Sequence, residues 1–388
     1  MSQPNFVRVI SSSTTGALSS LPRSIVIASR ETISGFTPDA NSGLVSITAA
    51  TVAAFNTANP TAYGFKKALQ TAFAGSVQPS VIYLLSTAGV ALTSTMLDTA
   101  NYSPRSWSFL NVASQTNGLD DEATFLADCL TAANWCTAAK RKIFFHSFTV
   151  DSDTPVLPAA LQLGGSLTTQ ARIKSIITNA VEAVDEYTDV YCNPLLAALV
   201  FVLYGGSIAR SIGSLSDAHD FPDVTTDTYS ATFRATIEAN SLAQYNGAKD
   251  QGGSLFVYDT QMNDDVNPAT TPEIETIIAQ DYIDDFVTIF VRNSLQAAGK
   301  TGVEASQKGL MEIYSLTNSA LQALWQAGAI LTDDTGQADY TLVLKTLAQI
   351  TALDPTWQST GIIPTGAIVA EIAAYKAIHY VTLAFNYN

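Results

Sequence analysis

The stretch TAYGFKKALQTAFAGSVQPSVIYLLS (61–86) places an amphipathic helix pattern directly before an apolar run. The helix pattern, residues 61–75, ends at Gly75, and glycine is a common residue just beyond the end of a helix. The apolar run, residues 80–86, is short enough for a buried strand. A helix followed by such a strand is the repeating unit of an open α/β sheet.

The same alternation continues on both sides of this stretch. Further strand-like runs lie at 24–29, 43–48, 106–113 and 142–148. A second helix is predicted over 120–136, where acidic residues at its start complement the helix dipole. Residues 167–187 are predicted to form the last long helix of this part. The sequence therefore predicts an α/β domain with an open sheet over residues 25–190.

The second half of the chain is richer in helical patterns. Helices are predicted over 271–302, 315–330 and 365–378, and strands over 252–261 and 339–350. A buried element over 195–209 follows Asn193-Pro194, a good helix start. These patterns predict a helix-rich α+β domain over 191–378. The predicted fold class of the whole chain is therefore α/β (α+β).

Both ends of the chain are predicted to be extended arm strands, over 1–24 and 379–388. The last residues, HYVTLAFNYN, alternate between an apolar and a polar side, which is the period of a strand. The N-terminal segment NFVRVI (5–10) has a similar composition, and SSSTTGALSS follows it. The residues predicted to pair with other subunits are Phe6, Val7, Val9, Ile10, Tyr380, Val381, Thr382, Leu383, Ala384, Phe385, Asn386 and Tyr387. The alternative is that both ends pair within their own subunit.

Composition excludes several classes of protein. The chain carries 34 acidic against 19 basic residues, a formal charge of −15, and no stretch is basic enough to neutralise a nucleic-acid backbone. The longest apolar run is shorter than the ~20 residues that a membrane span needs, so no direct membrane insertion is expected. Charged residues make up 14% of the chain, below the ~25% usual for soluble domains. Low charge is typical of surfaces that are buried against other proteins.

The best candidate for catalysis is Ser207, in the pattern Gly205-Gly206-Ser207-Ile208-Ala209. A small residue on each side of a serine resembles a nucleophile elbow, and His379 lies downstream with several Asp between them. However, Asn193-Pro194 begins a helix, so no strand leads into this elbow. A glycine break in a buried helix is the favoured interpretation, and an α/β serine hydrolase remains the alternative function. No catalytic residue is therefore assigned.

No cofactor or metal site is predicted either. Asp281 and Asp285 lie one helical turn apart, but a hard cation needs more oxygen ligands than these and Asp284 supply. Cys129, Cys136 and Cys192 occur at no metal-binding spacing and are predicted to be buried free thiols. The basic segment AKRKIFF (139–145) is interpreted as a helix C-terminus whose dipole is complemented.

The C-terminal third resembles the sheath proteins of contractile phage tails and related injection machines. The resemblance covers about 120 residues and follows the order of their elements. A long helix over 271–298 is followed by SALQALWQAGAI (319–330), a strand region, the turn GIIPTG (361–366), a last helix and a terminal strand. The chain departs from the family in one respect, because Thr365 and Gly366 follow Pro364 where an acidic residue is usual.

The resemblance implies a structural subunit with no cofactor. Such a subunit polymerises as stacked hexameric rings or a helix around an inner tail tube and contracts to drive the tube through the host envelope. Its implied partners are further copies of itself, the inner tail tube protein, and baseplate and tail terminator proteins. It would be located in the virion tail and assembled in the host cytoplasm. A static virion or surface-layer protein is a further alternative, because it would share assembly but not contraction.

Overall fold

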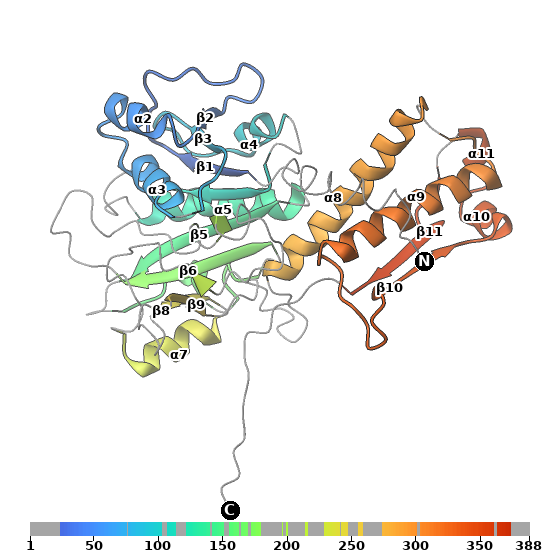
Figure 1. Cartoon of the computed structure of the whole chain (residues 1–388). Coiled ribbons are helices and arrows are strands. Elements are labelled where there is room, and N and C mark those ends of the chain that lie inside the picture. The colour runs from blue at the N-terminus through green and yellow to red at the C-terminus, as the bar shows by residue number, and fades with distance from the viewer. Residues whose placement is uncertain are drawn as a thin grey trace, which may run out of the picture. The chain divides into compact units, whose positions relative to one another are not determined.

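The structure is a computed structural model of the chain (Figure 1). The residues it describes are 24–75, 77–102, 107–113, 122–139, 142–150, 155–162, 164–169, 172–179, 196, 199–200, 214–215, 229–240, 242–246, 255–258, 274–300, 303–360 and 363–373.

The described residues divide into two compact units between Ile274 and Glu275. The sequence placed this division between residues 190 and 191. The difference arises because three strands beyond residue 190 belong to the same sheet as the first strand of the chain: Ser214–Leu215, Ala243–Asn246 and Leu255–Tyr258. We call residues 24–274 the sheet unit and residues 275–373 the second unit.

The sheet unit contains nine strands among the described residues. They are β1 (Ile25–Ser29), β2 (Val45–Ile47), β3 (Ile82–Ser86), β4 (Phe109–Val112), β5 (Ile143–Val150), β6 (Ile173–Asn179), β7 (Ser214–Leu215), β8 (Ala243–Asn246) and β9 (Leu255–Tyr258). Their order is β2-β3-β1-β4-β5-β6-β8-β9-β7. The run from β3 to β8 is parallel, and β2, β9 and β7 are antiparallel to their neighbours. The predicted α/β class is confirmed.

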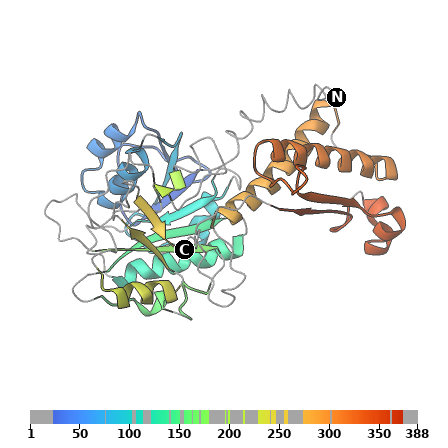
Figure 2. The same cartoon turned by 60° about the horizontal axis from the view of Figure 1, so that its bottom comes forward.

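Helices cover both faces of this sheet. They are α2 (Val52–Ala58), α3 (Tyr63–Phe73), α4 (Ser94–Ala100), α5 (Glu122–Ala139), the 3-10 turn η1 (Ala159–Leu161) and α7 (Ala231–Ala239). Helix α5 packs on β4, β5 and β6, α7 packs on β8, and α3 packs on β1. Figure 2 shows α2 and α3 on one side of the sheet and α5 and α7 on the other. Val26, Leu110 and Phe144 lie side by side on adjacent strands, on the face of the sheet that α5 covers.

Strand β6 corrects the helix that the sequence predicted over 167–187. Ile173, Ile176 and Ile177 are all fully buried, so apolar residues occur on both faces of this strand. A parallel strand buried on both faces has no simple alternation of apolar and polar residues. Its pattern therefore cannot be told from that of a buried helix by periodicity alone.

The basic segment after α5 also differs from its interpretation as a helix C-terminus. Helix α5 has no basic residue in its last turn. Lys142 instead lies directly before β5, where its ammonium group donates to the Trp107 carbonyl and lies 4.1 Å from the centre of the Trp107 ring. Trp107 stacks on Trp135 with 5.6 Å between ring centres. The buried cation therefore joins the start of β5 to the loop before β4.

The prediction of buried free thiols is confirmed for Cys129 and Cys136. Both lie on the core side of α5, fully buried and unpaired. Burial raises the pKa of both thiols, because the thiolate would lose its hydration. Cys192 lies outside the described residues.

His146 is a buried polar side chain in the centre of the sheet unit. Its ring stacks on Phe144 with 5.2 Å between ring centres, and Nδ1 lies 3.4 Å from the Ser175 hydroxyl. Among the described residues its Nε2 has no hydrogen-bond partner, and the residue is 0% exposed. Burial lowers the pKa of His146 to about 3, because the imidazolium would be stripped of water.

The second unit is smaller, and its described residues form six elements. They are α8 (Ile274–Ala297), α9 (Gln307–Gln326), β10 (Tyr340–Leu344), α10 (Leu347–Leu353), α11 (Trp357–Thr360) and β11 (Ile368–Ile372). Helix α9 packs on β10, and β10 pairs antiparallel with β11. One compact cluster joins Leu310 of α9, Ile350 of α10, Trp357 of α11 and Ala367.

Two predicted elements of this unit are wrong in type or length. The strand expected over 339–350 ends at Leu344, because Thr346 and Gln349 form a capping box that begins α10. The helix expected over 365–378 is replaced by strand β11. Gly366 has a φ of 86°, which ends the turn after Pro364, and Ile368 to Ile372 then pair with β10. Tertiary pairing therefore overrides the alanine-rich helix pattern here.

Acid is expected to weaken the sheet unit through His146. Because the folded pKa lies below the ordinary value of 6.5, the unfolded chain binds a proton that the folded chain rejects between about pH 6.5 and 3. The stability of the wild-type protein should fall by up to ~1.4 kcal/mol per pH unit in this range, beyond what a His146→Phe variant shows. Thermal melting of both proteins from pH 7.5 to 4.5 measures this difference. A His219→Phe variant is the control, and His219 lies outside the described residues. Parallel curves for the wild type and His146→Phe would contradict the expectation.

Candidate assembly surface

The carboxyl end of β1 is the position at which an open α/β sheet is expected to bind a ligand. The connection from β1 to β3 contains α3, which covers one face of the sheet. The connection from β3 to β4 contains α4, which covers the opposite face, because Leu97 of α4 belongs to the same core cluster as Val26. The direction of winding therefore reverses at β1. Open α/β sheets bind ligands at this reversal, outside the carboxyl ends of the strands. Arg30 and Glu31 directly follow β1 at this position.

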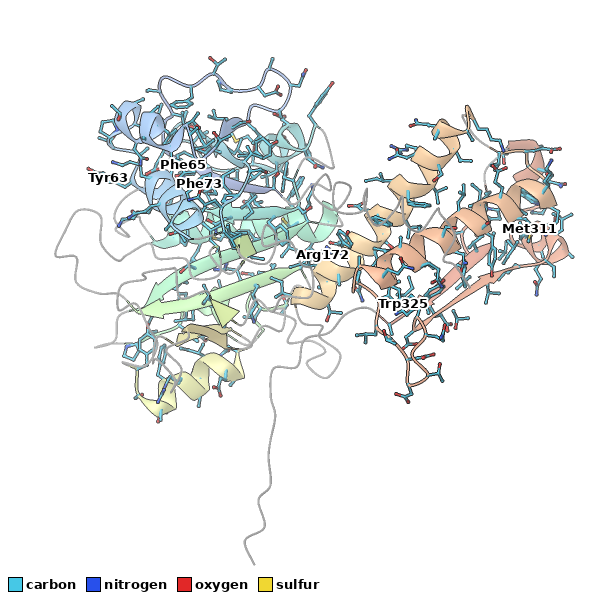
Figure 3. All side chains as sticks on the ribbon, in the orientation of Figure 1. Tyr63, Phe65, Phe73, Arg172, Met311 and Trp325 are labelled. Atoms are coloured by element: carbon cyan, nitrogen blue, oxygen red, sulfur yellow. The ribbon has the colours of Figure 1, made fainter. Side chains whose placement is uncertain are left out.

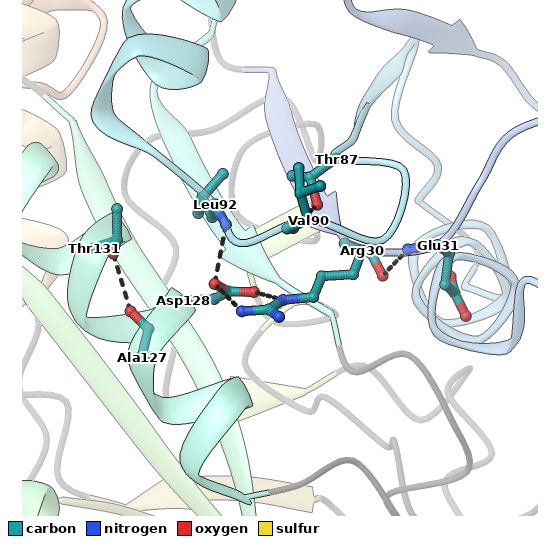
Figure 4. Close-up of polar contacts among 9 residues, drawn as sticks. Arg30, Glu31, Thr87, Val90, Leu92, Ala127, Asp128 and Thr131 are labelled. Carbon is teal, nitrogen blue, oxygen red and sulfur yellow. Dashed lines mark hydrogen bonds and ion pairs between the residues drawn. The ribbon is translucent and has the colours of Figure 1, made fainter.

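Arg30 is fully engaged with the protein itself. Its Nε and Nη2 donate to the two carboxylate oxygens of Asp128 on α5, at 2.6 and 2.8 Å. The same carboxylate accepts the main-chain N–H of Leu92 at 3.0 Å (Figure 4). A two-pronged guanidinium–carboxylate pair is among the strong, geometrically specific contacts in proteins. It joins β1, α5 and the loop that leads to α4.

Glu31 fills the neighbouring anion site. Its two carboxylate oxygens accept the main-chain N–H groups of Gly64 and Phe65, at 2.7 and 2.8 Å. These groups belong to the first turn of α3, where a helix offers unpaired donors and a positive dipole end to an anion. The protein therefore supplies its own anion at the position where a ligand phosphate would bind. Both charged groups at this edge are used to hold the sheet unit together.

In the second unit, by contrast, the described elements leave the edges of the sheet uncovered. In the described part of the chain its sheet has two strands, β10 and β11, so each strand has one edge without a neighbour. Lys345 N–H donates to the Ala367 carbonyl, and Ala373 N–H donates to the Asp339 carbonyl. Hydrogen-bonded pairs alternate along an antiparallel ladder. The main-chain groups of Ile368, Ala370 and Ile372 therefore point away from β10, toward the open edge of β11.

One face of this sheet is also open. Tyr340, Leu342 and Leu344 are half-buried on the side where α9 packs, and the Tyr314 hydroxyl donates to the Leu342 carbonyl at 3.2 Å. On the opposite side Val343 lies directly across from Val369, and they are 50% and 37% exposed. An apolar cross-strand pair in solvent is unusual for a surface that stays exposed.

Large exposed apolar side chains gather in this smaller unit. Those of the second unit are Met311, Leu331, Val343, Leu347, Leu353, Ile363 and Val369, and those described in the sheet unit are Val90, Tyr102 and Val156. Figure 3 shows the labelled Met311 on α9 near α10 and α11. A concentration of such residues marks a surface that another protein covers. The second unit is therefore the candidate site, and its chemistry is that of assembly.

The residues that the sequence predicted for assembly lie outside the described part. This applies to Phe6, Val7, Val9 and Ile10, to the segment 380–387, and also to Ser207 and His379. Asp281, Asp284 and Asp285 do lie on α8. Among the described residues no group of three or more His, Cys, Asp or Glu side chains could hold a metal ion. None of the described helices is long and apolar enough to cross a membrane.

Sequence reasoning missed the open face and edges of β10 and β11. Val343 and Val369 each look ordinary in the sequence, and only their register places them side by side. Two signals were available in the sequence: the alternating run Tyr340 to Leu344 and the β-branched residues Ile368 and Val369. The helix expected over 365–378 hid the second of them.

The chain was compared with known proteins by family model, by sequence and by structure. No family model matches the chain, and no curated protein matches it by sequence. A chain in the cryo-EM structure of the anti-feeding prophage baseplate has a TM-score of 0.65 and 14% identity, with 95% of this chain and 93% of that chain covered.

Two crystal structures of sheath tail proteins are similar to a lower degree. The protein from Listeria innocua has a TM-score of 0.49 and 9% identity, covering 87% of this chain and 92% of that one. The protein from Desulfitobacterium hafniense has a TM-score of 0.47 and 11% identity, covering 83% and 90%. At the level of the fold this chain is similar to a chain of the anti-feeding prophage baseplate, which supports the resemblance that the sequence predicted.

Proposed function

We propose that this chain is a non-enzymatic structural subunit of a contractile tail sheath. Copies would polymerise as stacked hexameric rings or a helix around an inner tail tube, and contraction would drive the tube through the host envelope. The observation that carries the proposal is the β10–β11 sheet, which in the described chain has two open edges and an apolar pair on its open face. The fold likeness, which extends over 95% of the chain, supports it.

The two terminal arms are proposed to complete this sheet in other subunits. An extended segment can add a strand to an open edge, where main-chain hydrogen bonds attach it and alternate side chains set its register. The proposed arm strands are Phe6 to Ile10 and Tyr380 to Tyr387, and the open edge of β11 offers the main-chain groups of Ile368, Ala370 and Ile372. Rigid subunits joined by such arms can rearrange without separating.

The remaining partners follow from the same proposal. The sheath would contact the inner tail tube protein along its length, and baseplate and tail terminator proteins at its two ends. Its place would be the virion tail, assembled in the host cytoplasm. No cofactor is required, because the work of contraction is stored in the lattice of subunits.

Electron microscopy of the purified chain tests the proposal. Tubes or rings are expected, and two lattice states built from the same subunit fold would separate a contractile sheath from a static virion or surface-layer protein. A serine-reactive fluorophosphonate probe tests the alternative enzyme. Stoichiometric labelling of Ser207, lost in Ser207→Ala, would overturn the structural function.

Deleting residues 380–388 should leave a folded monomer that no longer forms long tubes. The deletion removes several intermolecular hydrogen bonds at ~0.5–1.5 kcal/mol each, and the burial of Val381, Leu383 and Phe385 at ~1.5–3 kcal/mol each. Circular dichroism, thermal melting and electron micrographs are read together. A monomer that melts earlier while its assembly stays intact would show that the strand pairs within its own subunit.

A pair of point variants makes this test milder. Leu383→Lys places a charge on the apolar side of the arm and should prevent assembly, whereas the neighbouring Thr382→Lys places the same charge on the polar side and should be tolerated. Equal effects of the two substitutions would argue against a strand with one buried side.

Attachment of the sheath to its tube should weaken as salt increases. The chain has a formal charge of −15, so the tube surface it binds is expected to be basic. Exposed ion pairs are screened beyond a Debye length of ~8 Å at physiological ionic strength. Co-sedimentation of the chain with tubes between 50 and 500 mM salt measures this, and attachment that does not change with salt would show that apolar contacts dominate.

A further inference from the structure

The second unit has two chemically different ends. Between residues 275 and 373 the sequence has eleven acidic residues and four basic ones, Arg292, Lys300, Lys308 and Lys345. Helix α9, with 20 residues, separates the ends by ~30 Å. Figure 3 shows the labelled Met311 and Trp325 toward opposite ends of this helix.

The first end, which we call the acidic end, follows the C-terminus of α9. It consists of Leu331, Asp333, Asp334, Asp339 and Glu371. Main-chain hydrogen bonds hold it together: Leu331 N–H donates to the Ala373 carbonyl, and Asp339 N–H donates to the Leu331 carbonyl. Leu331, whose main chain these hydrogen bonds hold beside Asp339 and Ala373, is 37% exposed. In the described chain no cation forms an ion pair with Asp334, Asp339 or Glu371.

The opposite end, which we call the apolar end, surrounds the small core of the unit. It consists of the exposed side chains Met311, Leu347, Leu353 and Ile363 together with Lys308 and Lys345. Leu310 ties it together by packing on Ile350 and Trp357. Lys300 pairs with Glu312 at 2.6 Å, whereas Lys308 and Lys345 form no ion pair in the described chain. Glu304, Glu312 and Asp354 balance the three lysines here, so this end carries no net negative charge.

The charges at both ends oppose the dipole of α9. A helix is stabilised by acidic residues in its first turn and basic residues in its last turn. The first turn of α9 contains Lys308 and no acidic residue, the last turn contains no basic residue, and the acidic end lies just beyond it. This arrangement disfavours the isolated unit. The acidic end therefore lacks a cationic partner, and Lys308 and Lys345 at the other end are cations without an ion pair in the described chain.

We propose that the acidic end of one copy binds the apolar end of a second copy. Leu331 would enter the patch of Met311, Leu347, Leu353 and Ile363, and its surrounding carboxylates would pair with Lys308 and Lys345. A contact between two different surfaces of the same chain is heterologous, so it propagates rather than closing as a dimer. Because each copy is strongly acidic overall, an end without net negative charge repels a second copy less than an acidic surface does.

This inference rests on the proposed function in one respect, that the chain assembles with itself. It concerns a different contact from the terminal arms, which join main chains at sheet edges. The deletion of residues 380–388 leaves both ends of the second unit unchanged. The two contacts can therefore be tested independently.

Charge reversal at each end tests the proposal. Asp334→Lys/Asp339→Lys removes the net negative charge of the acidic end and places two lysines where Lys308 and Lys345 of the next copy would bind, and Lys308→Glu/Lys345→Glu makes the apolar end negative. Each double variant alone should form at least tenfold fewer tubes than the wild type, because like charges then meet. An equimolar mixture should recover assembly, since every contact in an alternating polymer is again complementary. Glu238→Lys, in α7 of the sheet unit, is the matched control for added positive charge and should assemble normally.

Several outcomes would overturn the proposal. They are double variants that each assemble as well as Glu238→Lys, and a mixture that fails to recover although both variants keep the wild-type melting temperature. If Lys345→Glu prevents folding, Lys308→Glu alone replaces that variant. An acidic-end variant that polymerises normally but no longer attaches to tubes would assign this end to the tube protein instead. If the wild type forms no tubes at all, the proposed function fails, and heteroassociation of the two variants by light scattering still decides this contact.

Discussion

A sheet of two strands leaves half of its main-chain hydrogen-bonding groups without strand partners. Strands β10 and β11 satisfy each other along one edge, and α9 covers the β10 side of one face. Two-stranded sheets are marginal in water unless further strands or packed helices support them. The other features of the second unit follow from this constraint: its half-buried strand residues, its exposed valine pair and its small core around Trp357 all suit a surface that is completed by other chains.

The sheet unit has the opposite character. Its parallel strands are covered by helices on both faces, and its charged residues at the ligand-binding edge are used internally. Arg30 is held by Asp128, and Glu31 caps α3, so neither is available to a substrate. A domain whose charged residues at this edge are bound by its own side chains and main chain is suited to move as a rigid body. The proposed sheath needs both characters, because rigid units must rearrange about contacts that stay attached.

The sequence predicted the class of the fold because strong local signals determine most of it. Short apolar runs became β1, β3, β4 and β5, and the long helical patterns became α5, α8 and α9. Local signals failed where burial is two-sided or where pairing is distant. Strand β6 is apolar on both faces and was taken for a helix, and β11 is helical by composition but is held extended by β10. The short helices α4 and α7 were missed because each spans only two or three turns.

The candidate site was predicted only in part, for a related reason. The alternating residues of the terminal segment are visible in one sequence, so the proposed arms were accessible. Their acceptor was not, because the open edge of β11 exists only once Ile368 to Ile372 pair with β10. The chemical difference between the two ends of the second unit could not be seen in the sequence either. Lys308 and Asp339 are 31 positions apart, and only the course of α9 and β10 places them at opposite ends.

Amide hydrogen exchange at the open edge of β11 tests the central claim most directly. The amides of Ile368, Ala370 and Ile372 point away from β10, and those of Val369 and Glu371 point toward it and serve as internal references. The account predicts that the first three exchange rapidly in dilute monomer and become protected when the chain assembles, while the reference amides are protected in both states. Protection of all five in the monomer would show that the chain completes its own sheet. Rapid exchange of the first three in assembled tubes would show that no strand is added at this edge.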